Sequence, residues 1–354
     1  MSANKRIIFI VNPLSGTSGK NMAIQLIEKH LDKSLWDYDI VKTGYIGHAT
    51  EIAREAARHG VDVVCAVGGD GTVNETARGL IHTQTALGII PAGSGNGLAR
   101  HLHIPIDTLG AIKVLNAAHI EQMDYGVVNN REFFCTCGVG FDAFISKKFA
   151  EAGKRGPLTY IENVLKSSLQ YNPETYEIEI ISNNGEEERH ETYKAFLISC
   201  ANASQYGNNA YIAPLASVRD GLLDFTIIEP FNALEAPAIA MQLFDGTIER
   251  NSRIKTFRGT KAIIRRKDAG VIHYDGDPLD TAKDISVELV PKGLLCVCPM
   301  TEGVPDVGRR VQGFFTEHFF QMYTRSEELF QENIRKTQRI TKLNIDILNK
   351  LSHK

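Results

Sequence analysis

The chain has 354 residues, with 39 lysines and arginines against 42 aspartates and glutamates, and 43% of its residues are hydrophobic. This length suggests two domains of ordinary size, and the composition excludes a disordered, fibrous or collagen-like chain. The net charge of −3 argues against a dedicated nucleic-acid binder, which usually carries a basic excess. The 6 cysteines are thinly scattered, so they are not a disulfide framework.

The apolar stretches are all far shorter than the roughly 20 residues that a helix needs to cross a bilayer. The run of residues 7–11, after Lys5 and Arg6, is too short for the core of a signal peptide and predicts a buried strand. We therefore expect a cytoplasmic protein that would reach any lipid by peripheral association with a membrane surface.

The first third of the chain alternates strands and helices. Apolar runs predict strands, and apolar residues at helical spacing predict helices between them. The strands are expected over 7–11, 38–41, 61–67 and 86–90, and the helices over 20–31, 48–59 and 74–81. This alternation predicts an open parallel sheet with helices on both faces.

The pattern changes near Asp124, where many short strands follow one another without regular helices between them. They are expected over 127–128, 133–137, 176–181, 195–200, 223–228, 262–265, 285–290 and 294–297, with helical inserts over 158–169 and 233–244. Such a run predicts an antiparallel sandwich or barrel. We therefore expect a nucleotide-binding α/β domain over 1–124, a β-rich domain over 125–300 and a helical C-terminal extension over 301–354.

The motif with the clearest chemistry is Gly68-Gly69-Asp70-Gly71-Thr72-Val73-Asn74-Glu75, between a predicted strand and a predicted helix. Its glycines allow the backbone to approach a ligand closely, and backbone amides at a helix N-terminus favour an anion. Thr72 and Glu75 have the spacing of a capping box, which predicts the helix start there. Asp70 has no evident cationic partner in the sequence, and a carboxylate beside bound phosphate makes chemical sense if Mg²⁺ lies between them.

Two further polar loops follow predicted strands of the same sheet. Asn12-Pro13-Leu14-Ser15-Gly16 follows the first strand, and Pro91-Ala92-Gly93-Ser94-Gly95-Asn96-Gly97 follows the strand over 86–90. Loops after parallel strands meet at the carboxyl edge of the sheet, where ligands bind. Each loop alone could be an ordinary turn, but together the three loops predict a phosphate-sized crevice.

Other familiar sites are excluded by spacing. Gly16 to Lys20 has two residues between its glycines where a Walker A loop has four, and no dinucleotide-binding, serine-hydrolase or zinc spacing is found. A basic and aromatic stretch over 144–166 could touch anionic lipid or could be an ordinary solvated helix face.

The three loops together resemble the diacylglycerol kinase catalytic family, which includes bacterial lipid kinases and sphingosine and ceramide kinases. The resemblance extends over roughly residues 5–300 and implies ATP and Mg²⁺ in a cleft between the two domains. By position, the nucleotide contacts would come from Asn12, Pro13, Ser15, Gly16, Thr43, Gly68, Gly69, Asp70, Gly71, Thr72, Asn74, Glu75 and Ser94. Asp70 would hold the catalytic Mg²⁺ through water, supported by Asp124, and Asp220 with the backbone carbonyls of Ser217 and Leu222 would bind a structural Mg²⁺.

Two positions depart from the family pattern. Asp275-Gly276-Asp277 resembles the D-G-E motif, whose Glu is the general base toward the lipid hydroxyl, so Asp277 would take this role with a side chain one methylene shorter. Gly97 stands where many bacterial diacylglycerol kinases carry an Asp. The sequence of that loop, Gly-Ser-Gly-Asn, more closely resembles sphingosine and ceramide kinases, which slightly favours a sphingoid base as the expected acceptor.

The leading hypothesis is therefore an ATP- and Mg²⁺-dependent lipid kinase that acts on diacylglycerol or a sphingoid long-chain base. Two alternatives stay open: a kinase of a soluble acceptor resembling NAD kinase, and a lipid- or nucleotide-binding protein that has lost catalysis. The final predicted helix is a candidate for pairing with a second subunit.

Overall fold

A computed structural model describes residues 4–13, 20–152, 171–181, 187–232 and 234–300. The chain divides into two units, Met1–Val304 and Pro305–Lys354, and every described residue lies in the first. The helices expected over 158–169 and in the C-terminal extension lie outside the described residues.

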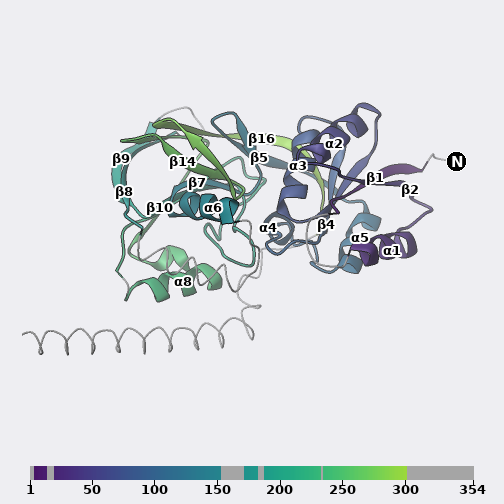
Figure 1. Cartoon of the computed structure of the whole chain (residues 1–354), viewed down its shortest axis with the longest axis horizontal. Coiled ribbons are helices and arrows are strands. Elements are labelled where there is room, and N and C mark those ends of the chain that lie inside the picture. The colour runs from purple at the N-terminus through teal and green to yellow at the C-terminus, as the bar shows by residue number, and fades with distance from the viewer. Residues whose placement is uncertain (1–3, 14–19, 153–170, 182–186, 233, 301–354) are drawn as a thin grey trace, which may run out of the picture. The chain divides into compact units, whose positions relative to one another are not determined.

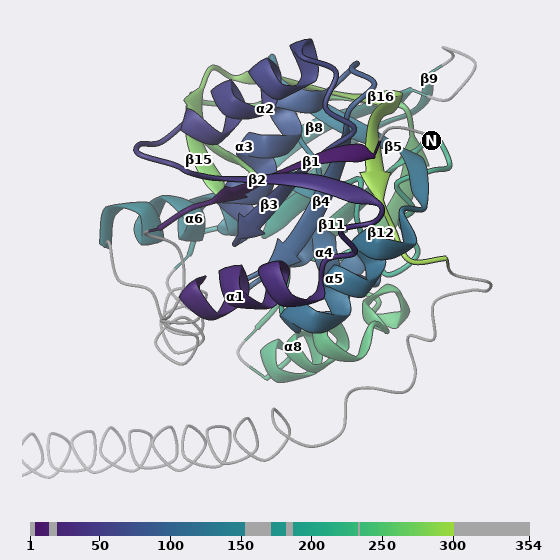
Figure 2. The same cartoon turned by 90° about the vertical axis from the view of Figure 1, so that its right-hand side faces the viewer.

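The N-terminal part is a parallel sheet with helices on both faces, as predicted. Its strands are β1 (Lys5–Val11), β2 (Trp36–Lys42), β3 (Val63–Gly68) and β4 (Ala86–Pro91), in the order β2-β1-β3-β4. Its helices are α1 (Lys20–His30), α2 (His48–Arg58), α3 (Asp70–Leu80), α4 (Gly97–His101) and α5 (Thr108–Ala117). Figures 1 and 2 show α2 and α3 on one side of this sheet and α1 and α5 on the other. The two central strands β3 and β4 are buried along their whole length, which explains their continuous apolar sequences.

The β-rich part is a sandwich. One of its sheets continues the N-terminal sheet in the order β4-β16-β13-β8-β9, with β5 paired to β16 and β6 paired to β5. The other has the order β12-β11-β10-β7-β14-β15. The strands are β5 (Ile120–Val128), β6 (Arg131–Phe133), β7 (Thr136–Gly140), β8 (Glu174–Ile181), β9 (Glu187–Ala195), β10 (Leu197–Ala201), β11 (Leu223–Ile228), β12 (Ile254–Gly259), β13 (Lys261–Arg266), β14 (Gly270–Tyr274), β15 (Asp277–Thr281) and β16 (Asp284–Val297). The helices are α6 (Phe141–Ala152), α8 (Ala236–Asp245) and the short 3-10 helix η1 (Ile248–Arg250).

Alternate residues of the two sheets form the core of the sandwich. Tyr176, Ile178 and Ile180 of β8 are buried there, whereas Glu177 and Glu179 between them point outward. Phe225 and Ile227 of β11 belong to the same core. The period-2 pattern of β8 thus records one face packed and one face solvated.

Strand β16 connects the two parts. It pairs antiparallel with β5 and β13, and its Cys296 pairs in parallel register with Leu87 of β4. An irregularity between Val290 and Leu294 lets one strand serve both parts. The domain boundary near residue 125 stays a prediction; it falls inside β5, whose Met123 and Tyr125 pack in the N-terminal core.

Two predicted elements differ from the observed ones. Helix α3 begins at Asp70 rather than Asn74, with Gly69 in an extended conformation as its N-cap residue, so the predicted capping box is wrong. The strand expected over 133–137 is two strands, β6 and β7. The break has a physical reason, because the amides of Phe134 and Cys135 donate to the Asp275 carboxylate instead of to a neighbouring strand.

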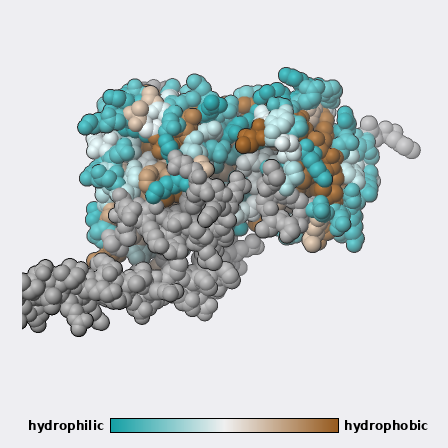
Figure 3. All heavy atoms as spheres, in the orientation of Figure 1, coloured by the Kyte–Doolittle hydropathy of each residue, from teal (hydrophilic) through white to brown (hydrophobic). Residues whose placement is uncertain are grey.

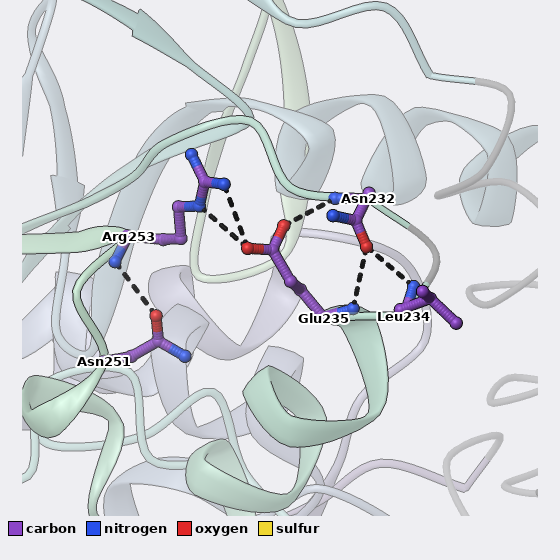
Figure 4. A network of polar contacts seen from close by, with 5 residues as sticks. All are labelled: Asn232, Leu234, Glu235, Asn251 and Arg253. Carbon is purple, nitrogen blue, oxygen red and sulfur yellow. Dashed lines mark hydrogen bonds and ion pairs between the residues drawn. The ribbon is translucent and has the colours of Figure 1, made fainter.

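The turn that leads into α8 is held by reciprocal side-chain contacts. Asn232 Oδ1 accepts from the amides of Leu234 and Glu235, and Glu235 Oε2 accepts from the amide of Asn232 at 2.9 Å. Figure 4 shows that Arg253 also holds this glutamate, with Nη2 at 2.9 Å from Oε1. These contacts satisfy the amides of Leu234 and Glu235, which precede Ala236, the first residue of α8.

Candidate active site

The polar loops after the parallel strands meet at one edge of the sheet. The amide of Thr43 donates to the carbonyl of Val11, and Asn12 Nδ2 lies 3.4 Å from Thr72 Oγ1. The amide of Ala92 donates to the carbonyl of Gly68 at 2.8 Å. The ends of all four strands therefore lie together at this edge, and they include the three loops that the sequence predicted to meet there. Pro13 is exposed, and Ser15 and Gly16 lie outside the described residues.

The two glycine-rich loops pack backbone against backbone. A Cβ atom added to Gly93 would lie 2.5 Å from the Cα of Gly69, and one added to Gly69 would lie 3.1 Å from the Cα of Gly93. The approach excludes a side chain at position 93, whereas a side chain at position 69 would require the neighbouring backbone to shift by a few tenths of an ångström. The contact sets the distance between the start of α3 and the loop that carries Ser94, which is exposed at its tip.

Asp70 joins these loops through its side chain. Its Oδ2 accepts from the amide of Asn96 at 2.9 Å, and its Oδ1 accepts from the amide of Gly97 at 2.7 Å. The sequence shows no cationic partner for Asp70. In the structure, its carboxylate binds backbone amides at the start of α4 instead. Because an ionised carboxylate has about four acceptor positions, both oxygens keep capacity for a further donor or a hydrated cation.

The first turn of α3 has open space beside Gly71. That residue is exposed, and a Cβ added there would meet nothing within 4 Å. The first amides of a helix lack a carbonyl partner one turn earlier, and the helix dipole adds positive potential there. Thr72 and Asn74 are buried, and Glu75 accepts from the amide of Ala49 in α2. The first turn is therefore open to a ligand, whereas Glu75 ties α3 to α2.

The Asp275-Gly276-Asp277 segment is a tight hairpin turn between β14 and β15. Asp275 and Gly276 have φ angles of 50° and 87°, the left-handed pair that an Asp-Gly hairpin turn of type I′ requires. Asp277 is exposed and pairs with Tyr274 across the hairpin. The turn therefore presents the predicted base at an edge of the sandwich.

Asp275 anchors this turn, a role that the sequence analysis missed. Its carboxylate accepts from the amides of Phe134, Cys135 and Thr136 at 2.8, 2.8 and 3.1 Å. Burial raises the pKa of Asp275 to about 6 against the opposing effect of these three amides. An Asp-Gly pair signals a turn, but nothing local indicates which amides the Asp binds.

Electrostatic contacts connect the region of this hairpin turn with α3. Burial raises the pKa of the Cys135 thiol, and the charges of Asp275 and Asp70 raise it further. Arg78 of α3 lies over the ring of Tyr274 at 5.3 Å. The charges of Asp70 and Asp275 thus both act on Cys135, whereas a joint role of Asp70 and Asp277 stays a prediction.

Asp124 lies with the predicted structural cation site. Its Oδ2 accepts from the amide of Gly221 at 2.9 Å, and its Oδ1 accepts from the amide of Lys292 at 2.7 Å. The contacts of its carboxylate are thus to the 217–222 loop and to β16, so its support for Asp70 stays a prediction.

Arg258 supplies a positive charge next to that loop. It forms ion pairs with Asp220 and with Asp224, whose Oδ1 lies 3.2 Å from Arg258 Nε. Burial raises the pKa of Asp224 to about 6, although Arg258 opposes this shift. Across the part of the chain that the structure describes, no group of three or more His, Cys, Asp and Glu side chains could hold a metal ion.

A seam between α4 and the loop after β10 was also missed. The amide of Asn208 donates to the carbonyl of Gly95 at 3.1 Å, and Arg100 Nη1 lies 3.3 Å from Asn209 Oδ1. The Nδ1 atom of His101 accepts from the amide of Ser204 at 3.1 Å, and burial lowers the pKa of His101 to about 4. This seam joins the loop after β4 and helix α4 to the sandwich.

Comparison with known proteins gives the class of this fold and site. Residues 6–128 match the model of the diacylglycerol kinase catalytic domain, and residues 135–298 match the YegS C-terminal NAD kinase β-sandwich-like domain. A diacylglycerol kinase of Staphylococcus aureus is 30% identical over 235 residues, 65% of this chain and 73% of the relative. A probable lipid kinase YegS-like of Chromohalobacter salexigens is 29% identical over 258 residues, 71% of this chain and 80% of the relative.

A crystal structure of a diacylglycerol kinase from Bacillus anthracis has the same fold, with a TM-score of 0.63, 22% identity and coverage of 85% of this chain and 99% of that chain. The chain belongs to the diacylglycerol kinase family. The recognition made from the three loops is confirmed. Within the described residues, the helices are too short or too polar to span a membrane.

Proposed function

We propose that this protein is an ATP- and Mg²⁺-dependent lipid kinase that phosphorylates a hydroxyl group of diacylglycerol or of a sphingoid long-chain base. The observation that carries the proposal is the junction at Asp70. There one carboxylate fixes the amides of Asn96 and Gly97 beside the open first turn of α3. This arrangement suits a polyphosphate, because the backbone amides and the helix terminus favour negative charge.

In the proposed reaction, the oxygen of the lipid hydroxyl attacks the γ-phosphorus of ATP and the bond to the bridging oxygen of ADP breaks. Asp277 accepts the hydroxyl proton, and the developing charge on ADP is met by amides at the start of α3. The protein has little covalent chemistry to perform, since alignment and charge stabilisation supply most of the rate.

The donor groups fit Mg²⁺, which prefers oxygen ligands. Asp70 has acceptor capacity left on both oxygens, so water molecules around an ion could bind it. At the second proposed site, Asp224 Oδ2 is buried and has no hydrogen-bond partner among the described residues. Arg258 forms ion pairs with both Asp224 and Asp220. When bound, Mg²⁺ would neutralise charge on the phosphates of ATP.

The acceptor would be met at a membrane surface by the β-rich domain. In the described part of the basic stretch, Lys147 forms an ion pair with Asp280 at 2.9 Å and Lys148 lies over the ring of Phe144. Figure 3 shows hydrophilic residues over much of one face of the molecule. Two leucines of the β-rich domain, Leu215 and Leu234, are 70% and 84% exposed. A cytoplasmic location and a second copy of the chain as partner remain proposals.

The test is phosphate transfer from radiolabelled ATP to a panel of diacylglycerols, sphingoid bases, ceramides and monoacylglycerols in mixed micelles, with NAD as a soluble acceptor. Asp70→Ala should abolish transfer, and Asp268→Asn, at an exposed turn between β13 and β14, should leave it unchanged. Transfer only to NAD would favour the soluble-acceptor alternative. Tight ATP binding without transfer to any acceptor would favour a binding protein.

Asp277 gives a sharper prediction. Asp277→Ala should lower kcat by about 100-fold or more, the usual contribution of a general base. Asp277→Glu lengthens the side chain by about 1.5 Å, and a misplacement of about 1 Å can cost about 100-fold in rate, so the two acids should differ measurably. Rates of single turnover at saturating ATP measure this, and equal rates in wild type and Asp277→Ala would exclude Asp277 as the base.

A further inference from the structure

A buried polar cluster lies in the sandwich, outside the residues assigned above. Asp142 lies in the first turn of α6, His273 on β14 and Tyr206 in the loop after β10. Asp142 Oδ2 lies 3.0 Å from His273 Nε2 and accepts from the Tyr206 hydroxyl at 3.1 Å. His273 is 2% exposed and the Asp142 side chain 10% exposed. We name Asp142, His273 and Tyr206 the Asp–His–Tyr cluster.

The sandwich makes room for this cluster with a glycine. Gly138 of β7 pairs with His273 of β14, where α6 packs on the same strands (Figure 1). A Cβ added to Gly138 would lie 2.6 Å from Asp142 Oδ2 and 3.1 Å from His273 Nε2. Any larger residue would therefore displace the contact between the carboxylate and the imidazole.

Stability does not explain the cluster well. Burying a carboxylate and an imidazole removes both from water, and apolar residues of similar volume usually fill such a place at no loss. In addition, His273 Nδ1 is buried and finds no hydrogen-bond partner in the described part of the chain. A buried polar atom without a partner lowers the free energy of unfolding, so a functional reason is expected.

The backbone of Tyr206 lies against the loop that binds Asp70. The carbonyl of Tyr206 would lie 3.3 Å from a Cβ added to Gly97, and Gly207 lies against Gly95. Gly97 in turn donates its amide to Asp70. A shift of the Tyr206 backbone would therefore move the loop that Asp70 holds.

His273 lies on the strand that ends at the hairpin turn before Asp277. His273 is followed in β14 by Tyr274 and then by Asp275 and Gly276 of the hairpin turn. Because β14 is pinned to β7 at Gly138, the position of the imidazole fixes where this turn leaves the sheet. Asp277 is the first residue after the turn.

We propose that the Asp–His–Tyr cluster is a positioning device that fixes the Asp275–Gly276–Asp277 turn relative to the loop bound by Asp70. The inference rests on the proposed kinase function and extends it to residues that do not touch the reacting atoms. The three side chains connect α6, β14 and the loop after β10 through one carboxylate, so removing any one of them loosens one of the connections between the two sides of the site.

The first arm of the test needs no kinase activity. Hydrogen exchange is followed at the amides of Asn96 and Gly97, which bind Asp70, and of Phe134 and Cys135, which bind Asp275. Tyr206→Phe and His273→Gln should speed exchange at both sets. The control is Thr226→Val, which removes a buried side-chain hydrogen bond, from Thr226 Oγ1 to the carbonyl of Ile212, elsewhere in the sandwich. Exchange that matches the control at both sets would overturn the proposal.

The second arm uses phosphate transfer by the full chain. Tyr206→Phe should lower kcat by about tenfold and leave KM for ATP within about twofold, because alignment rather than binding is lost. In an Asp277→Ala background the same change should have almost no further effect, since residues that act as a unit are not additive. Additive losses would contradict positioning through Asp277. If wild type transfers no phosphate, the proposed function fails, and the exchange arm alone decides the cluster.

Discussion

At the scale of single residues, neighbouring acids of one turn have different environments. Asp275 is held by three backbone amides, whereas Asp277 is exposed at the start of β15. The sequence singled out Asp277 by its motif but could not show that Asp275 bridges residues about 140 positions away. Such a long-range contact leaves no periodic signal, because it depends on how β6, β7 and β14 meet.

The pKa of Asp275 yields a pH prediction. Its folded-state pKa is raised from 3.8 to about 6, so the folded state binds more protons than the unfolded chain between these values. The stability that this group contributes is therefore fully present below about pH 4 and is lost as the pH rises through about 6.

Asp275→Asn should remove this part of the pH dependence. We expect the difference in free energy of unfolding between wild type and the variant to change between pH 4 and 6 and to level off above pH 7. Urea unfolding at each pH measures it. Asp224, whose pKa is also raised to about 6, remains in both proteins and cancels in the difference. A difference that does not vary with pH would contradict the prediction.

At the scale of elements, the glycines of the two loops have separable roles. Gly93 is needed for contact with Gly69, whereas Gly71 borders open space at the first turn of α3. The sequence treated all these glycines alike, as places of close approach to phosphate. The structure assigns the backbone contact to one pair and leaves another glycine available to a ligand.

A pair of alanine substitutions tests this division. Gly93→Ala should lower both the melting temperature and ATP binding, because its Cβ would lie 2.5 Å from the Cα of Gly69. Gly71→Ala should keep or raise the melting temperature, since alanine is favoured over glycine in a helix by about 1 kcal/mol. Gly71→Ala should nevertheless weaken ATP binding, measured by calorimetry, because the methyl group enters the proposed phosphate space. Unchanged ATP affinity in Gly71→Ala would place the nucleotide elsewhere.

The fold was predictable where burial leaves a pattern. The continuous apolar runs of β3 and β4 and the alternation in β8 identified strands correctly. Strands β9, β12, β14 and β15 were missed, and each carries polar residues or the edge proline Pro278, which hide the alternation. The three loops of the site were found because glycine and strand ends are local signals, whereas the seam at Ser204 to Asn209 depends on tertiary contact.

At the scale of the whole molecule, the two parts share a sheet. Leu294, Cys296 and Val297 of β16 and the following Cys298 pack in the N-terminal core, together with Met123 of β5. A boundary between domains drawn in sequence therefore does not separate two independent cores.

A fragment test follows from this shared strand. Residues 1–128 alone would lack β16 and leave β4 as an unpaired edge, which invites association with other chains. We expect this fragment to aggregate or to unfold without a cooperative transition, whereas residues 1–304 should melt cooperatively. Circular dichroism during heating and size-exclusion chromatography measure both properties. A monomeric fragment with a sharp transition would show that β16 is dispensable for the N-terminal core.

The same strand has a consequence for synthesis on the ribosome. Strand β16 runs through residues 284–297, so the sheet that holds the phosphate-side loops is incomplete until most of the polypeptide has left the exit tunnel. Nascent chains that already carry the glycine-rich loops would expose the unpaired edge of β4. We expect such chains to depend on holdase chaperones until translation delivers the missing piece.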